Sequence, residues 1–167
     1  MAKTIYVVRH AKSSWADLTM TDKDRPLNKR GQRDAPIMAS YCALHGYKPD
    51  RMITSTAVRA STTASHFAEV LEIDPVHYMA YDSLYHAPAQ TYIETCYQLG
   101  DEVSSVMLFG HNPGITYLAN EVATDFIDNV PTCGVLVIDY SGDSWQSIDV
   151  NQCSLRTMIT PKSIANE

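Results

Sequence analysis

The chain has 167 residues, the length of one ordinary domain, so a second domain is not expected. Hydrophobic residues at 45% and charged residues at 19% exclude a disordered chain, and a formal net charge of -6 excludes the basic balance of a nucleic-acid-binding protein. No segment approaches the roughly 20 apolar residues of a membrane span, and no long apolar leader is present. We expect one domain over residues 1–160, a loose tail over residues 161–167, no membrane association and a cytoplasmic location.

Five short apolar runs predict strands, and they alternate with segments of helical periodicity through the first 125 residues. The runs are Thr4–Arg9, Arg51–Ser55, Val76–Met79, Ser105–Phe109 and Val135–Tyr140. This alternation predicts an α/β fold with a parallel sheet. A turn signal after the fifth run predicts a terminal antiparallel hairpin or meander formed by Trp145–Val150 and Leu155–Ile159.

An apolar stripe with helical spacing follows the first strand. It consists of Ala35, Met38, Ala39 and Cys42. Asn28 is predicted to cap this helix and Gly46 to end it. Because Pro36 lacks an N–H and clashes one turn back, we expect a kink or two helical pieces there. Further helices are predicted within residues 60–71, 89–97 and 115–122.

The cysteines and most of the histidines show no spacing typical of a metal site. The four cysteines, expected to be buried thiols, are Cys42, Cys96, Cys133 and Cys153. The histidines interpreted as structural or surface residues are His45, His66, His77 and His86. We therefore predict no metal site and no cofactor.

Four other polar residues follow predicted strands. Arg9 and His10 end the first run, Arg59 follows the second in STAVRASTTA, and His111 follows the fourth in FGHNPG. The carboxyl ends of parallel strands meet at the edge where open α/β sheets bind ligands, so we expect these side chains to converge on one site. We call Arg9, His10, Arg59 and His111 the central group.

The residue types of the central group fit displacement at phosphorus. His10 can attack through one ring nitrogen while the other donates a hydrogen bond, which gives a phosphohistidine intermediate that water later cleaves. The planar guanidinium groups of Arg9 and Arg59 match the geometry of phosphate oxygens, and His111 completes the phosphate site.

Neighbouring polar residues are weaker candidates. Further phosphate contacts are predicted at Lys12, Ser13 and Asn112. Ser13 fits equally well as a residue that completes the loop, and Asn112 can cap a helix whose N-terminus attracts anions. A basic cluster is interpreted as a solvated face, with the alternative that it guides an anionic partner surface; it consists of Lys12, Arg25, Lys29, Arg30 and Arg33.

Four blocks of the sequence resemble the histidine phosphatase (phosphoglycerate mutase-like) superfamily, in particular its small SixA-type phosphohistidine phosphatase branch. The blocks are RHAKSSW at Arg9–Trp15, DRPLNKRG at Asp24–Gly31, TSTAVRASTTA at Thr54–Ala64 and GHNPGI at Gly110–Ile115. The resemblance implies a three-layer α/β/α sandwich with a mostly parallel central sheet, and a single histidine phosphatase domain over residues 1–160. It also implies that His10 is the nucleophile and that Arg9, Arg59 and His111 bind phosphate.

The chain departs from the superfamily pattern where a general acid is expected. Asn112 replaces the aspartate of the acid phosphatase branch, residues 83–88 contain no glutamate of the mutase type, and Ala11 replaces the usual glycine. An ester needs a proton on its leaving group, whereas a phosphoramidate can leave as neutral imidazole. We therefore expect metal-independent hydrolysis of phosphohistidine on a protein. Candidates for a proton donor or substrate contact are Asp17, Tyr85 and His86.

Two alternatives remain for the function. One is a phosphatase acting on small phosphomonoesters, and the other is a phosphoprotein-binding module without catalysis. The expected partner is thus a phosphorylated protein or a small phosphorylated substrate, while the oligomeric state is left open.

Overall fold

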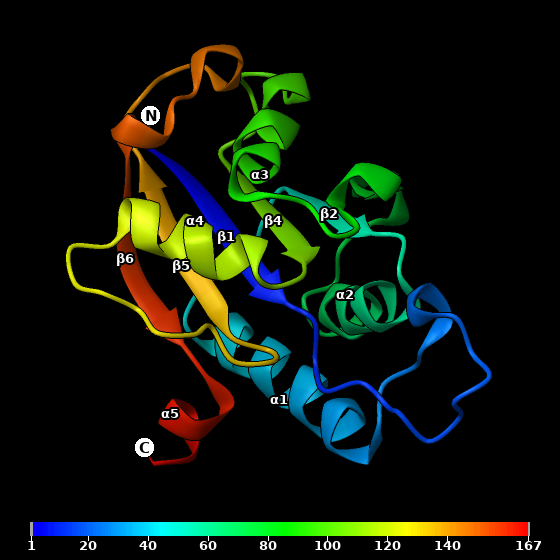
Figure 1. Cartoon of the computed structure of the whole chain (residues 1–167). Helices are drawn as coiled ribbons and strands as arrows, with labels where there is room; N and C mark the ends of the chain where they lie inside the picture. Colours follow the sequence, from blue (N-terminus) through cyan, green and yellow to red (C-terminus); the bar gives the residue numbers. More distant parts are fainter. Residues whose placement is uncertain (1, 167) are drawn as a thin grey trace.

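The computed structural model describes residues 2–166, which form a six-stranded sheet with helices on both faces (Figure 1). The strands are β1 (Lys3–Arg9), β2 (Arg51–Ser55), β3 (Tyr78–Tyr81), β4 (Ser105–Gly110), β5 (Val135–Tyr140) and β6 (Cys153–Ile159). They lie in the order β3-β2-β4-β1-β5-β6. The first four of these pair in parallel, and β5 pairs antiparallel with both β1 and β6. The expected mostly parallel sheet is confirmed.

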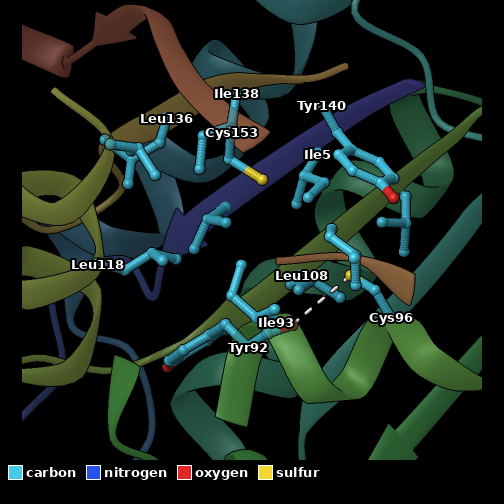
Figure 2. Packing of buried hydrophobic residues seen from close by; sticks show 14 of the residues in the cluster. Ile5, Tyr92, Ile93, Cys96, Leu108, Leu118, Leu136, Ile138, Tyr140 and Cys153 are labelled. Carbon is cyan, nitrogen blue, oxygen red and sulfur yellow. Dashed lines mark hydrogen bonds between the residues drawn. The ribbon is translucent and has the colours of Figure 1, made fainter. Parts of the chain in front are cut away.

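Helices cover both faces of the sheet, which confirms the three-layer α/β/α sandwich. They are α1 (Lys29–Leu44), α2 (Val58–Val70), α3 (Ala89–Thr95), α4 (Gly114–Val122) and α5 (Pro161–Ala165). Buried residues form two clusters, one between the sheet and α3 with α4, the other between the sheet and α1 with α2. Figure 2 shows part of the first cluster, to which α3 contributes Tyr92 and Ile93 and β4 contributes Leu108.

The two clusters explain why β1 carries a continuous apolar run. Successive side chains of a strand point to opposite faces, so Val7 belongs to the cluster with α3 and α4, and Val8 to the cluster with α1 and α2. Neither side chain is exposed to solvent. The polar residues that follow this strand therefore start from a rigid position at the centre of the sheet.

The predicted ends of α1 are present. Of the two alternatives expected at Pro36, a kink or two helical pieces, the second is wrong. The Asn28 side chain accepts the N–H of Gly31 at 2.9 Å, and Gly46 follows the helix with a φ of 74°. The helix runs unbroken through Pro36. A proline removes only one backbone hydrogen bond, and burial of the predicted stripe holds the helix together on both sides of it.

Two strand predictions need correction. The run Val76–Met79 is displaced, because Pro75–His77 forms a 3-10 turn capped by the Asp74 side chain and β3 begins only at Tyr78. Trp145–Val150 is not a strand but contains the 3-10 turn Trp145–Ser147. The Trp145 side chain is fully buried and its indole N–H donates to the Val103 carbonyl at 2.7 Å, so packing of one aromatic residue fixes this segment. The antiparallel partner of β5 is β6, as expected for a meander.

The C-terminal segment is not a loose tail as far as the structure describes it. Residues 161–165 form α5, where Thr160 and Ser163 exchange side-chain and backbone hydrogen bonds in a capping box. Ile164 packs against the cluster beneath α1 and α2. Residue 167 lies outside the described residues.

The cysteines are free and buried, as predicted. Within residues 2–166, no set of three or more histidine, cysteine, aspartate or glutamate side chains is arranged to hold a metal ion. No helix in the same part of the chain combines the length and the apolarity needed to cross a membrane.

Candidate active site

The central group comes from the carboxyl ends of three adjacent strands. His10 directly follows β1, His111 directly follows β4, and Arg59 lies in the first turn of α2, which follows β2. Because these strands are neighbours in the sheet, their ends meet at one edge. The ring centroids of His10 and His111 are 5.2 Å apart, and the charges of Arg9 and Arg59 act on the His10 ring. The structure therefore brings the four residues together.

The ring of His10 is oriented by the backbone that follows it. Its Nδ1 lies 2.7 Å from the carbonyl oxygen of Ala11, and because a carbonyl only accepts, the hydrogen of the neutral ring lies on Nδ1. Burial lowers the pKa of His10 to about 4, and although the Ala11 hydrogen bond raises it, the charges of Arg59 and Arg9 lower it further. At neutral pH the ring is uncharged, with Nε2 available as a nucleophile.

His111 is held through its backbone and its ring. The Tyr92 hydroxyl accepts the backbone N–H of His111 at 3.0 Å. A Cβ on Gly110 would lie 2.1 Å from that hydroxyl, so the close approach requires glycine. On the ring, Nε2 lies 2.8 Å from Ser55 Oγ at the end of β2. Ser55 Oγ already accepts the N–H of Ala57, so its own hydrogen is free for Nε2, which favours a proton on His111 Nδ1.

The two arginines use only part of their hydrogen-bonding capacity. Arg9 Nη1 donates to the Val130 carbonyl at 3.0 Å. Arg59 Nη1 and Nη2 donate to the backbone oxygen and to Oδ2 of Asp22, at 2.6 and 2.9 Å. Each guanidinium has five N–H groups, so further donors remain on both.

Three buried side-chain nitrogens have no hydrogen-bond partner within the described residues. They are Arg9 Nε, Arg59 Nε and His111 Nδ1, and all belong to the central group around His10. Buried polar groups are otherwise nearly always paired, so such a cluster indicates donors kept for a ligand. Burial, followed by the nearby charges of His10 and Arg59, lowers the pKa of His111 to about 3. Its ring is thus a neutral donor beside two permanent cations, an arrangement suited to a small oxyanion.

Among the weaker candidates, Ser13 and Lys12 are not joined to the central group by any contact that the structure describes. Ser13 Oγ accepts from Arg25 Nη1 at 2.8 Å, which supports the loop-completing alternative. Lys12 is half-buried, and its backbone oxygen accepts the N–H of Asn28 at 2.9 Å. Arg25 itself is 7% exposed, so placing it on a solvated face was wrong. Its hydrogen bonds inside the loop explain the burial.

Asn112 and Asp17 serve local structure. The N-cap residue of α4 is Pro113, so the prediction that Asn112 occupies the cap position is wrong by one residue. Asn112 Oδ1 still accepts the N–H of Thr116 in the first turn of α4 at 3.0 Å, and its Nδ2 donates to the same Val130 carbonyl that binds Arg9. Asp17 lies in an exposed turn, where its carboxylate accepts two hydrogen bonds from Thr19. Those bonds lower the pKa of Asp17, the opposite of what a proton donor needs.

Tyr85 and His86 do lie beside the central group, and they meet there a residue that the sequence reasoning missed. Their ring centroids are 5.6 and 5.9 Å from that of His111. The Tyr85 hydroxyl donates to Asp22 Oδ2 at 2.5 Å, and His86 Nε2 lies 3.4 Å from the same oxygen. Asp22 stands two residues before the DRPLNKRG block, in a polar loop without periodicity, so no sequence signal distinguished it from its neighbours.

The protonation of Asp22 and Tyr85 is set by their mutual contact. Burial alone would raise the pKa of Asp22, but hydrogen bonds from Tyr85, Arg59 and Arg25 outweigh it and hold that pKa well below its usual range. Burial and the hydrogen bond to Asp22 raise the pKa of Tyr85. Asp22 is therefore a carboxylate at neutral pH, and Tyr85 is a weaker acid than a free tyrosine.

Thr63 is a second missed residue, and it ties two segments of the site together. Its fully buried hydroxyl accepts the N–H of Ala11 at 2.9 Å and donates to the carbonyl of Arg59 at 2.7 Å. The chain after β1 is thus bonded to the first turns of α2. The signal was present in the TSTAVRASTTA block, where a hydroxyl residue stands one helical turn after Arg59.

Comparison with known sequences assigns the chain to a class of proteins. A family model described as the histidine phosphatase superfamily (branch 1) matches residues 5–80. An uncharacterized protein of Mycobacterium tuberculosis is 31% identical over 166 residues, which cover 93% of this chain and 100% of that protein. An uncharacterized chloroplastic protein of Arabidopsis thaliana is 31% identical over 156 residues, covering 87% and 70%. The chain belongs to the histidine phosphatase superfamily.

One solved structure narrows this assignment to the SixA-type branch. A protein that bears the name SixA, from Agrobacterium tumefaciens, is 31% identical and superimposes with a TM-score of 0.80 over 95% of this chain and 98% of its own. The protein histidine phosphatase SixA complexed with tungstate superimposes with a TM-score of 0.79 over 96% and 99% of the two chains. At 18% identity the second similarity concerns the fold alone.

Proposed function

We propose that this protein removes phosphate from phosphohistidine on another protein through a covalent phosphohistidine at His10. The observation that carries the proposal is the set of three unpartnered buried nitrogens, which the structure groups around one uncharged histidine. A tetrahedral phosphoryl group presents oxygens to such donors while its phosphorus faces the nucleophile. The Agrobacterium tumefaciens relative, which is described as a phosphohistidine phosphatase, supports the same substrate class.

In the first step His10 Nε2 attacks phosphorus, and the bond from phosphorus to the substrate nitrogen breaks. The electron pair of that bond moves to the leaving imidazole, which departs neutral when its other nitrogen carries a proton. Arg9 and Arg59 stabilise the charge on the equatorial oxygens. Water then attacks phosphorus, the bond to His10 breaks, and inorganic phosphate is released. The scheme uses no metal ion or other cofactor.

The surroundings of the leaving group support phosphohistidine over a phosphate ester. Asp22 remains ionised and Tyr85 holds its proton more tightly than a free tyrosine, so neither is suited to protonate an alkoxide at neutral pH. His86 is the remaining candidate donor, with a side chain that is 59% exposed. Phosphohistidine needs no strong acid, because its leaving group is a good one.

The buried thiols and the acidic surface support two further parts of the proposal. Burial raises the pKa of Cys42 to about 12 and keeps it as an unreactive thiol, which fits a reducing compartment such as the cytoplasm. The net charge of -6 disfavours nucleic acids as substrates and is compatible with a phosphorylated protein or a small phosphorylated substrate as the partner.

The proposal is tested by trapping the intermediate. Incubation with a protein carrying labelled phosphohistidine, followed by an alkaline quench, should leave acid-labile label on His10. His10→Ala should abolish both label and turnover while the far-UV spectrum is unchanged. His66→Ala, which alters a half-buried histidine bonded to Gln32, should retain both.

Turnover on a panel of phosphohistidine proteins, sugar phosphates and nucleotides decides among the alternatives. A large preference for simple phosphomonoesters would support the small-molecule phosphatase. Tight binding of the phosphoprotein with neither label nor turnover would support the binding module.

A further inference from the structure

Asp22 and Arg59 are joined by an arrangement that leaves one part of the guanidinium free. The carboxylate and the backbone oxygen of Asp22 take one hydrogen from each terminal nitrogen of Arg59. The Nε–H of Arg59 is buried and has no partner within the described residues. Since the guanidinium is planar, fixing its two terminal nitrogens also fixes the direction of Nε–H.

Asp22 is itself held from several directions. Its Oδ2 accepts from Tyr85 at 2.5 Å, and its Oδ1 accepts from Arg25 Nε and Nη2 at 3.2 and 3.1 Å. Arg25 is held in turn by Ser13 and by the ring of Trp15, whose centroid is 3.6 Å from the guanidinium carbon. The loop between β1 and α1, which contains Asp22 and Arg25, lies beside α1 and α2 in Figure 1. A carboxylate restrained in this way can determine the orientation of Arg59.

We propose that Asp22 is a positioning residue, which orients Arg59 so that its free N–H groups bind the transferring phosphoryl group. The inference rests on the proposed function and adds to it a residue that acts without touching the phosphate. Asp22 is anionic, so direct contact with phosphate oxygens would be repulsive. Its effect on catalysis is transmitted through Arg59, a long side chain that loses considerable rotamer freedom when it is fixed.

This role predicts that loss of the Asp22 carboxylate lowers kcat much more than it weakens the binding of an anion. Without Asp22 the guanidinium charge stays at the site and still attracts an oxyanion, but its donors are no longer aligned with the transition state. With phosphoramidate as the substrate, Asp22→Asn should lower kcat about 10- to 100-fold, because misplacement by about 1 Å can cost that much. The inhibition constant of tungstate should weaken by no more than about threefold, since the attraction of charges depends less on orientation.

A double-mutant cycle tests whether Asp22 acts through Arg59. In an Arg59→Ala background, Asp22→Asn should change kcat by less than about twofold, because there is no guanidinium left to orient. Effects that multiply, or a loss of tungstate binding as large as the loss of kcat, would overturn the proposal. Asp24→Asn is the matched control, because Asp24 lies in the same turn but its carboxylate accepts from Thr21.

Two measurements keep the outcome interpretable. Urea unfolding of each variant shows whether it is folded. If Asp22→Asn does not fold, Tyr85→Phe is used instead, because it removes one hydrogen bond from Asp22 Oδ2. It should give a smaller loss of kcat, and tungstate binding should again be retained. Labelling of His10 in the unaltered protein is measured in parallel. Its absence would refute the proposed function, whereas its presence together with multiplying effects would refute only the role of Asp22.

Discussion

The two ends of β1 each carry a buried or half-buried cation, and the two cations differ in how many of their hydrogen-bond donors have partners. At the amino end, Lys3 is 2% exposed, and its Nζ donates to the carbonyls of Asp101 and Val103, both at 3.0 Å. At the carboxyl end, Arg9 donates one hydrogen bond to Val130, and its Nε has no partner within the described residues.

The difference separates a structural cation from a functional one. A buried charge is costly unless protein groups satisfy it, and the carbonyls around Lys3 do so. Arg9 remains partly unsatisfied together with Arg59 and His111, which means that the folded protein bears this cost at the one edge of the sheet where the strand ends converge. Unused donors, rather than charge alone, mark the candidate site.

Removal of a cation from the carboxyl ends of the strands, where donors lack partners, should have the largest effect on activity. Arg59→Ala should reduce kcat/KM for a phosphohistidine protein by about 2–4 kcal/mol of transition-state stabilisation, by analogy with loss of an oxyanion donor. Steady-state kinetics measure it, with Arg33→Ala on the exposed side of α1 as the control. Near-normal turnover of Arg59→Ala would remove this residue from the phosphate site.

Removal of the satisfied cation should affect stability instead. Lys3→Met keeps the aliphatic stem but deprives two carbonyls of a donor, so the free energy of unfolding should fall by about 1–3 kcal/mol. Urea denaturation measures this loss, and kcat/KM should stay unchanged because Lys3 lies at the opposite end of the strand. The exposed Lys29 supplies the control variant, Lys29→Met. A loss of activity without a loss of stability would contradict the comparison.

Acid should lower the free energy of unfolding through the two histidines at the carboxyl ends of β1 and β4. The pKa values of His10 and His111 are lowered to about 4 and about 3, from about 6.5 in an unfolded chain. Between these values the unfolded state binds more protons, so the free energy of unfolding should decrease as pH falls from 6.5 towards 4. Urea denaturation across this range should show the decrease, with a shallower slope in His10→Gln. A His10 ring that titrates near pH 6.5 by NMR would disprove the assignment.

A change in the hydrogen bond behind His111 should have the smallest effect. Ser55→Ala removes the hydroxyl that favours a proton on Nδ1, and kcat/KM should fall about 3- to 10-fold, as for loss of one hydrogen bond. Ser61→Ala, in which the lost hydroxyl binds only a carbonyl of its own helix, should leave kcat/KM unchanged. Equal effects of the two substitutions would show that Ser55 has no particular role in orienting the ring.

Particular elements show why some of the fold was predictable from the sequence. The strand Thr4–Arg9 and the stripe of α1 are buried through their own periodicity, so local sequence specifies them. Trp145 and Pro75 show where prediction from apolar runs fails. The segment at Trp145 forms a 3-10 turn whose indole bonds to the distant Val103 carbonyl, and the segment at Pro75 forms a 3-10 turn with a local cap. Pro36 does not divide α1 into two pieces, since tertiary packing compensates for one missing hydrogen bond.

For the candidate site, the sequence by itself predicted which residues gather: two arginines and two histidines, each at or shortly after the carboxyl end of a buried strand in a mostly parallel sheet. Only the tertiary structure decided which nitrogens stay unpartnered and that Asp22, Ser55 and Thr63 hold the others in place. The physical reason is that hydrogen bonds between side chains depend on distances of a few tenths of an ångström across loops that have no periodicity. A sequence pattern reports burial, but it does not report such distances.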